Sequence, residues 1–257
     1  MIDMAFAYRR SDEFAGQVAL VTGSSRNIGR SIAESMAAGG AKVAVHGRVA
    51  LEEAQAVAQT IRDAGGDAEA YLADHVDKEQ IESFVVAVLQ RFGRIDHLIL
   101  NAAIREPATL TDATWEEWRR VLAIDLDSAF IYTKACLPSM IANGGGNIVT
   151  FGGANALSGA GTRVHVTSAK YGMIGFTKAA ANDLAQYNIR VNMVSPGSIA
   201  DDGVDPGQGG GGRLGRIPLG RQGVSEEIAT VVRFLCGPGG SYISGQTLHV
   251  NGGLVMY

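Results

Sequence analysis

The 257-residue sequence has few of the features that define several other protein classes. It contains only two cysteines, Cys136 and Cys236, which lie far apart and outside any spacing typical of metal ligands. A disulfide framework and a zinc site are therefore not indicated. No apolar run approaches the roughly 18 to 20 residues that span a bilayer. Residues 1–16 carry charges and no apolar core, so we expect an N-terminal extension there rather than a signal peptide.

The sequence also has no excess of charge of one sign. The net charge is -4 and the sequence pI is about 5.7, so there is no basic field that would hold a nucleic-acid backbone. Hydrophobic residues make up 46% of the chain and charged residues 19%, a composition typical of globular proteins with a sizeable core. We expect a cytoplasmic protein that binds a small-molecule substrate, with no nucleic acid, membrane or metal as partner.

Short apolar segments alternate along the chain with longer segments of helical period. This order predicts an α/β protein with a three-layer Rossmann fold, in which a doubly wound parallel seven-stranded sheet has helices on both faces. The length suits a single domain over residues 1–257. The expected strands cover residues 18–22, 42–46, 69–72, 95–101, 147–151, 189–194 and 247–250. The expected helices cover residues 29–38, 50–64, 78–92, 114–141, 165–186 and 225–235.

The segment 201–216 differs from the rest of the chain in composition. It begins DDGVDPGQGGGG, and so many glycines give it little reason to hold one conformation. It follows a predicted strand and therefore lies at the carboxyl edge of the sheet, where ligands bind in α/β proteins. We interpret it as a lid over the substrate, with a tolerated loop insertion as the alternative.

A glycine-containing turn joins the first predicted strand to the helix that follows it. Its sequence, Thr22 to Arg30, is TGSSRNIGR. At such a junction the backbone can approach a pyrophosphate closely, and the helix N-terminus supplies free N–H groups and a partial positive charge. The turn predicts a dinucleotide site, although an ordinary strand-to-helix turn would have a similar sequence.

Further motifs accompany this turn and cover the chain from about Gln17 to Gly253. They are ADHVD around Asp74, LILNAAI around Asn101, VTSAK ending at Lys170, IRVN, SPG ending at Gly197, and SGQTLHVNGG. Together they resemble the classical short-chain dehydrogenase/reductase family, in the style of bacterial 3-oxoacyl reductases. The resemblance implies a cofactor site built from Gly23, Ser25, Arg26, Asn27, Ile28, Gly29, Asp74, Asn101, Ala102, Lys170, Pro196 and Gly197.

Within that site the resemblance assigns separate places to the residues. The glycine turn would hold the pyrophosphate, Asp74 would lie near the adenine, and Lys170 would bond the ribose next to the nicotinamide. Asn27 stands where the family usually has glycine. Asparagine tolerates left-handed φ better than most residues, but its side chain narrows the approach of a phosphate.

The choice between the two dinucleotides can be argued from charge. Sites for NAD place an acidic residue after the second strand, whereas this chain has His46-Gly47-Arg48 there. A guanidinium suits the additional phosphate of NADP, so Arg48, with Arg26 in the turn, favours NADP(H) over NAD(H). The alternative is a solvated surface arginine at position 48, and a protein that binds no cofactor is also kept open.

The residues expected to carry the chemistry are largely missing. The family's proton-donating tyrosine stands four residues before the lysine, and that position is Val166. The serine that polarises the substrate carbonyl corresponds to Gly153, and the helix asparagine of a proton relay corresponds to Asp125. Lys170 alone matches the family's catalytic set.

Two residues are candidates for replacing the missing proton donor beside Lys170. His165 precedes the vacant position, and histidine can donate and accept protons near neutral pH, but its helix phase differs from that of Val166 by about 100°. It can equally be a packing or subunit-contact residue. Asp125 would point toward Lys170 and form a buried ion pair with it, or else be a solvated or capping carboxylate.

Several functions remain in play. The first is an NADP(H)-linked oxidoreductase of a small carbonyl or alcohol with a non-standard proton donor. The others are a non-redox enzyme on the same scaffold, such as a lyase, dehydratase or hydrolase, and a catalytically silent dinucleotide-binding partner subunit. The resemblance also implies a homodimer or homotetramer formed through the helices at 114–141 and 165–186. Substrate contacts would come from residues around Asn155 and Ser158 and from the glycine-rich segment.

Overall fold

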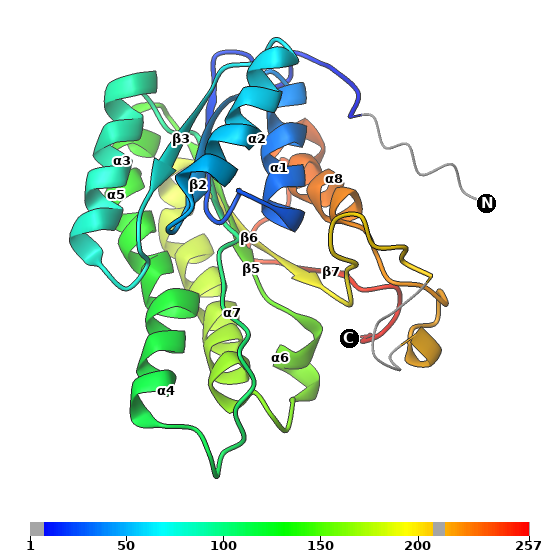
Figure 1. Cartoon of the computed structure of the whole chain (residues 1–257). Helices are drawn as coiled ribbons and strands as arrows, with labels where there is room; N and C mark the ends of the chain where they lie inside the picture. Colours follow the sequence, from blue (N-terminus) through cyan, green and yellow to red (C-terminus); the bar gives the residue numbers. More distant parts are fainter. Residues whose placement is uncertain (1–7, 208–213, 257) are drawn as a thin grey trace.

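A computed structural model describes residues 8–207 and 214–256. The strands in this part of the chain form one seven-stranded parallel sheet (Figure 1). The strand order is β3-β2-β1-β4-β5-β6-β7. The strands are β1 (Val18–Val21), β2 (Lys42–Gly47), β3 (Ala68–Leu72), β4 (His97–Leu100), β5 (Gly146–Phe151), β6 (Ile189–Pro196) and β7 (Thr247–Val250). The chain changes direction between β1 and β4, and ligands bind beside such a switch point in doubly wound sheets. The predicted fold class is confirmed.

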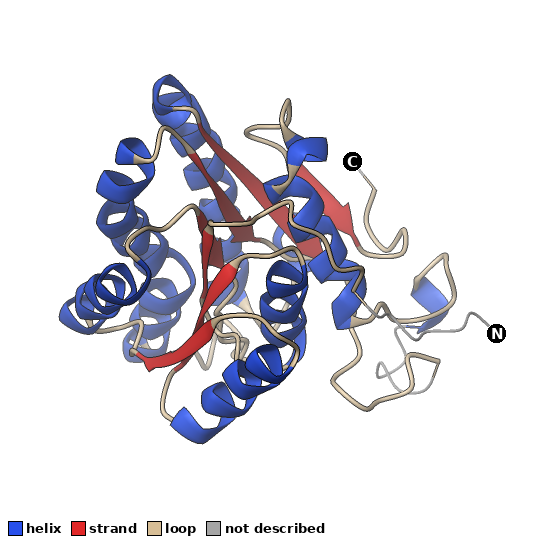
Figure 2. Cartoon of the chain, turned by 90° about the horizontal axis from the view of Figure 1, so that it is seen from above, coloured by secondary structure: helices blue, strands red, loops and turns tan. Residues whose placement is uncertain are grey.

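Helices cover both faces of this sheet, as the view along it shows (Figure 2). The layer that packs on one face contains α1 (Asn27–Ala38), α2 (Leu51–Asp63) and α8 (Ser225–Cys236). The layer on the other face contains α3 (Lys78–Phe92), α5 (Ser128–Ala142) and α7 (Val164–Leu184). Each layer buries its own apolar cluster against the strands, so the sheet separates two cores.

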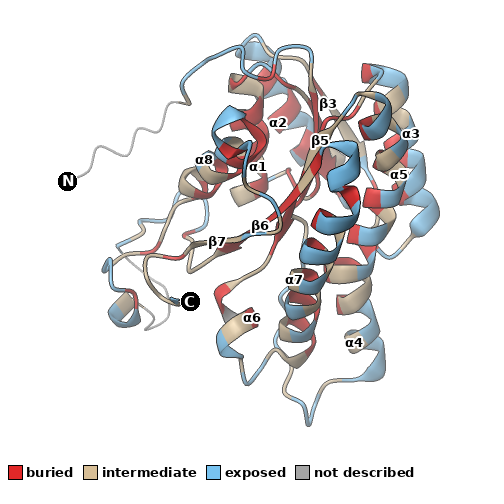
Figure 3. Ribbon diagram, turned by 180° about the vertical axis from the view of Figure 1, so that it is seen from behind, coloured by how far each residue is buried: buried red, intermediate tan, exposed pale blue. Residues whose placement is uncertain are grey.

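The two central strands explain why the sheet forms where it does. Every residue of β1 and of β4 is buried, and nearly all are apolar. Along β1, Leu20 joins the cluster on one face and Val21 joins the cluster on the other, and Leu98 and Ile99 of β4 alternate in the same way. A strand covered on both faces reads as a continuous apolar run, which is how these segments were predicted. Figure 3 shows buried residues along the strands and on the helix faces turned toward them.

The helix expected over residues 114–141 is interrupted. It consists of α4 (Trp115–Leu122), the π-helical turn η1 (Ala123–Asp127) and α5. A capping box between Thr114 and Glu117 starts α4. The π turn inserts an extra residue into the helical path, which a 3.6-residue pattern does not reveal, and such turns are frequent at functional sites. The short helix α6 (Ala154–Ser158) was not expected either.

The two unusual segments of the sequence are described in part. Residues 1–7 of the extension and residues 208–213 of the glycine-rich segment lie outside the described residues. In the extension, Phe14 is buried in the core below α1 and α8, and Glu13 forms an ion pair with Arg233 of α8. The described helices include none that is long and apolar enough to cross a membrane.

Candidate functional site

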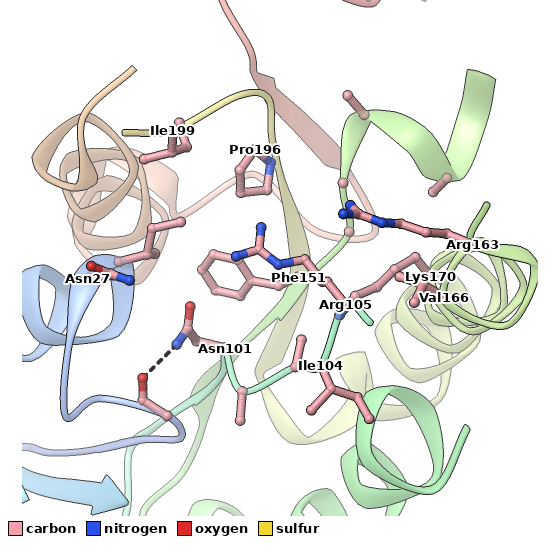
Figure 4. Close-up of a pocket in the computed structure, with 18 of the residues that line it drawn as sticks. Asn27, Asn101, Ile104, Arg105, Phe151, Arg163, Val166, Lys170, Pro196 and Ile199 are labelled. Carbon is pink, nitrogen blue, oxygen red and sulfur yellow. Dashed lines mark hydrogen bonds between the residues drawn. The ribbon is translucent and has the colours of Figure 1, made fainter. Parts of the chain in front are cut away.

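A cleft of about 900 Å³ opens at the carboxyl ends of the central strands (Figure 4). Its walls come from the glycine turn after β1, the ends of β2, β4, β5 and β6, the start of α7 and the segment after β6. All but one of the predicted cofactor residues line it: Gly23, Ser25, Arg26, Asn27, Ile28, Gly29, Arg48, Asn101, Ala102, Lys170, Pro196 and Gly197. Asp74, the remaining one, lies behind Arg48.

The glycine turn is a tight cradle in which two glycines are required. Gly23 has a φ of 61°, a conformation that favours glycine. A methyl group at Gly29 would collide with the carbonyl oxygen of Gly23. The Asn101 amide holds the turn against β4 by donating to the carbonyls of Thr22 (3.1 Å) and Gly23 (3.0 Å). Asn27 adopts a φ of 48°, so this asparagine takes the left-handed conformation.

Two buried histidines under this turn were not anticipated from the sequence. The Gly23 N–H donates to His46 Nδ1 (2.9 Å), which leaves Nε2 to donate to the Ala73 carbonyl (2.9 Å). Burial lowers the pKa of His46 to about 4, so the neutral ring required by these bonds persists at neutral pH. Burial also lowers the pKa of His75 to about 3, and Tyr132 Oη lies 3.2 Å from its Nε2. The one signal in the sequence for His46 as the acceptor of the Gly23 N–H was its position at the end of a strand.

The cation predicted to select the dinucleotide lies at the β2 end of the cleft. The Arg48 guanidinium is half exposed and lies 3.8 Å from the Asp74 carboxylate. The Asp74 N–H donates to Gln80 Oε1 (2.9 Å), which fixes the backbone of this carboxylate at the start of α3. Asp74 therefore aligns Arg48 along the cleft wall while the guanidinium remains accessible.

The N-terminus of α1 already holds an anionic side chain. Asp202 Oδ2 accepts a hydrogen bond from the Asn27 N–H (2.9 Å) and lies 3.1 Å from the Arg30 guanidinium. Asn27 Nδ2 donates to Asp201 (3.2 Å), and the Asp202 N–H donates to Asn27 Oδ1 (3.1 Å). A carboxylate at this position is stabilised by the helix dipole. The turn therefore has the geometry and the charge that a pyrophosphate requires, and its residues fit a dinucleotide.

Lys170 and Asp125 meet at the other end of the cleft, so Asp125 forms the buried ion pair and is not the solvated or capping carboxylate that the sequence also allowed. Lys170 Nζ lies 3.5 Å from Asp125 Oδ2, and the two side chains are 8% and 0% exposed. Asp125 Oδ1 accepts a hydrogen bond from the Ile104 N–H (2.8 Å), while Oδ2 has no hydrogen bond among the described residues. The π turn η1 carries Asp125 to this position, so the irregular helix and the ion pair are one feature.

The two positions to which the resemblance assigned the family's hydroxyl groups face the same space. Val166 and Gly153 both line the cleft, and Val166 packs against Val121 and Ala169. The described lining residues include no tyrosine. His165 is 1% exposed and lies outside that lining, where its Nδ1 accepts from the Val166 N–H (2.9 Å). The geometry thus gives no support to His165 as a proton donor in the cleft.

The remaining site predictions concern substrate contacts and metals. Ser158 lines the cleft from α6, whereas the side chain of Asn155 lies outside the described part of the structure. Within the described residues, no group of three or more histidine, cysteine, aspartate or glutamate side chains could hold a metal ion.

Comparison with known proteins gives matches along nearly the whole chain. The sequence model described as enoyl-(acyl carrier protein) reductase matches residues 23–255. The 3-oxoacyl-[acyl-carrier-protein] reductase FabG of Escherichia coli is 38% identical over 247 residues, which cover 95% of this chain and 99% of that protein. The trans-4-hydroxycyclohexanecarboxylate dehydrogenase of Sinomonas cyclohexanicum is 38% identical over 254 residues, covering 95% of each chain.

Solved structures agree with these sequence matches. A short-chain dehydrogenase from Burkholderia cenocepacia in complex with NADP has a TM-score of 0.88 and 32% identity, over 94% of this chain and 99% of that one. A blue fluorescent protein from a metagenomic library in complex with NADPH has a TM-score of 0.89 and 32% identity, over 95% and 100%. On the motifs, the sheet order and these relatives, the chain belongs to the short-chain dehydrogenase/reductase family.

Proposed function

We propose that this protein is an NADP(H)-linked oxidoreductase that acts on a carbonyl or alcohol group of a small molecule without the family's tyrosine. The observation that carries the proposal is the buried Lys170–Asp125 pair, which reaches the cleft where Val166 and Gly153 leave space. Two supports are independent of it: the solved relatives that hold NADP or NADPH, and the relative named for a hydroxy acid.

Three parts of this chain would hold the dinucleotide. The N–H groups at the start of α1 bind its pyrophosphate, and Arg48 pairs with the additional phosphate that distinguishes NADP from NAD. Lys170 lines the nicotinamide end of the cleft and binds the neighbouring ribose. The bound dinucleotide supplies or accepts the hydride.

A side chain of this protein must then transfer the proton. In the direction of reduction the carbonyl oxygen gains one proton, and the Lys170 ammonium is a donor at the cleft wall. Asp125 Oδ2 faces Lys170 Nζ and stabilises its charged form before transfer. Ile104 holds the other carboxylate oxygen through its N–H, so Asp125 stays aligned with the lysine. In the direction of oxidation the same nitrogen takes the proton back.

A second candidate function is a catalytically silent dinucleotide-binding subunit. The observation that favours it is that Val166 and Gly153 both line the cleft, because neither side chain can polarise or protonate a carbonyl. A non-redox reaction in which Lys170 and Asp125 act as an acid and base pair is the third candidate. The three differ in whether the protein binds a dinucleotide and whether it transfers hydride.

The assembly and location we propose follow from surface and burial. Phe130 of α5 and Tyr171 of α7 are each 59% exposed, so these helices offer apolar side chains to a second copy in a homodimer or homotetramer. Sedimentation at micromolar concentration should give a dimer or larger, and a monomer would overturn this. Both cysteines are buried and free, which suits the reduced cytoplasm.

The decisive experiment separates binding from turnover. The purified protein is titrated with NADPH and with NADH while cofactor fluorescence is followed, and a panel of oxo compounds is then tested for NADPH oxidation. The proposal expects tighter binding of NADPH and slow turnover that is lost in Lys170→Met combined with Asp125→Ala, the double variant that leaves neither charge of the pair buried alone. Binding without turnover would favour the silent subunit. A protein that binds neither dinucleotide would point to non-redox chemistry.

A further inference from the structure

The cleft is cationic although the chain as a whole is acidic. Its described lining includes seven lysines and arginines and only two acidic residues, whereas the net charge of the protein is -4. Three of these cations pair with carboxylates: Lys170 with Asp125, Arg48 with Asp74, and Arg120 with Glu106 at 3.2 Å. Arg26 belongs to the glycine turn. Arg105 and Arg163 stand at the opposite end of the cleft, near the proposed reaction centre.

The backbone fixes the segments that carry these two arginines beside Lys170. The Ile104 N–H is bound to Asp125, the partner of Lys170, so Arg105 follows directly on the catalytic ion pair. Three residues after Arg105, the Ala108 N–H donates to the Thr162 carbonyl (2.7 Å), and Ala108 forms a β-bridge with Arg163. The two segments are thus joined at the N-terminus of α7, one turn before Val166.

Both side chains extend into the cleft, where Arg163 is half-buried and Arg105 remains exposed to solvent. Figure 4 shows the Arg105 guanidinium extended between Phe151 and Pro196, and Arg163 pointing into the same space from the start of α7. Both residues line the cleft. Within the described residues Arg105 has no ion pair or hydrogen bond, in contrast to Arg120, whose guanidinium is already bound to Glu106. An arginine in a cleft without a carboxylate of its own can take one from a ligand.

We propose that Arg105, assisted by Arg163, binds a carboxylate of the substrate, so that the protein acts on an oxo acid or hydroxy acid rather than on a neutral carbonyl compound. The planar guanidinium fork matches a carboxylate with two parallel hydrogen bonds. With the acid group held there, the reacting carbon of the same molecule lies toward Lys170 and the space beside Gly153. This specificity rests on the proposed oxidoreductase function, but the recognition step precedes any hydride transfer.

Calorimetry with the NADP⁺-saturated protein and with the protein alone tests this step without turnover. The probes are mono-oxo acids of four to eight carbons, including 4-oxocyclohexanecarboxylate, and the matching neutral amides. Each acid that binds should bind about tenfold or more tightly than its amide, since a hydrogen-bonded charged pair is worth about 1.5 to 3 kcal/mol. Arg105→Met should remove this preference. Arg120→Met, the matched control, should change it less than about twofold.

The outcomes also separate this inference from the proposed function. Equal binding of acids and amides, or binding of none of the acids, overturns the inference. If Arg105→Met weakens NADPH and leaves the acid preference intact, the guanidinium serves a phosphate of the dinucleotide and the inference is again wrong. If the acids bind selectively through Arg105 but no acid is ever reduced, the inference stands and the oxidoreductase function fails.

Discussion

The two ends of the cleft differ in how much of the family's chemistry they retain. At the β1–β2 end the glycine turn is complete in shape, held by Asn101 and His46, and flanked by Arg48. At the α7 end Lys170 lines the cleft, and Val166 and Gly153 stand at the positions to which the resemblance assigns hydroxyl groups. Binding and chemistry are therefore separable on one sheet edge, because each depends on different loops of the same scaffold. This contrast can be tested from either end.

The largest effect should come from restoring the missing hydroxyls with Gly153→Ser and Val166→Tyr together. A Cβ at Gly153 meets no atom within 4 Å, so the serine fits, and position 166 faces the cleft. A positioned proton donor typically contributes 10² to 10⁴-fold. We expect NADPH-dependent reduction of an oxo compound to rise by about that factor, measured by loss of NADPH absorbance.

The matched control for this restoration is Gly153→Ala with Val166→Phe, which has nearly the same volume and no hydroxyl groups. A rate no higher in the serine and tyrosine variant than in this control would mean that the α7 end no longer positions a carbonyl. The β1–β2 end and the α7 end of the cleft would then differ in backbone shape as well as in their side chains.

Removing the charge partner at the α7 end should cost stability. Asp125→Ala leaves the Lys170 ammonium buried without a counter-charge and the Ile104 N–H without its acceptor. Breaking a buried pair in this way costs about 3 to 5 kcal/mol of unfolding free energy. Urea denaturation measures it, and Asp125→Ala with Lys170→Met should recover most of the loss. A change below about 1 kcal/mol in the single variant would show that water solvates this lysine freely.

At the other end of the cleft, Arg48→Ala should reduce the preference for NADPH over NADH by about tenfold, since one charge-assisted pair is lost. Fluorescence titration with both dinucleotides gives the ratio. Arg48→Lys keeps the charge but loses the planar fork and should fall between the two. An unchanged ratio of the two affinities in the alanine variant would show that Arg48 is a solvated surface arginine that does not select the dinucleotide.

The parts of this contrast that the sequence predicted are those governed by local pattern. Alternating apolar runs predicted the sheet, and the turn from Thr22 to Arg30 predicted the cradle, because both depend on neighbours in the chain. The family resemblance gave the meeting of Lys170 and Asp125 as one of two alternatives, beside a solvated or capping carboxylate. The π turn that carries Asp125 was not predicted, because residues 114–141 were assigned as one regular helix.

Contacts between distant segments were also beyond the sequence. The hydrogen bond from Gly23 to His46 and the contact of Asp202 with α1 join residues that are far apart in the sequence. The local sequence on either side does not indicate which residue will be contacted. The glycine-rich segment was interpreted as a substrate lid, and this stays a prediction; its described first residues, Asp201 and Asp202, contact Asn27 of the glycine turn. Composition indicated where that segment begins but carried no information about where its carboxylates would be bound.

The smallest expected effect concerns those carboxylates. Asp202 occupies the anion position at the start of α1 that a pyrophosphate would take, so the dinucleotide has to displace it and break its contacts with Asn27 and Arg30. Asp202→Asn removes that competing charge. Because the pair with Arg30 is partly exposed and worth at most about 1 kcal/mol, we expect NADPH affinity to rise about two- to fivefold.

The control is Asp205→Asn, at a carboxylate of the same segment that accepts a hydrogen bond from the Gly207 N–H, and it should leave NADPH affinity unchanged. If Asp202→Asn weakens NADPH binding instead, the aspartate orders the turn for the cofactor, and the well-preserved end of the cleft depends on this segment in the same way that the α7 end depends on Asp125.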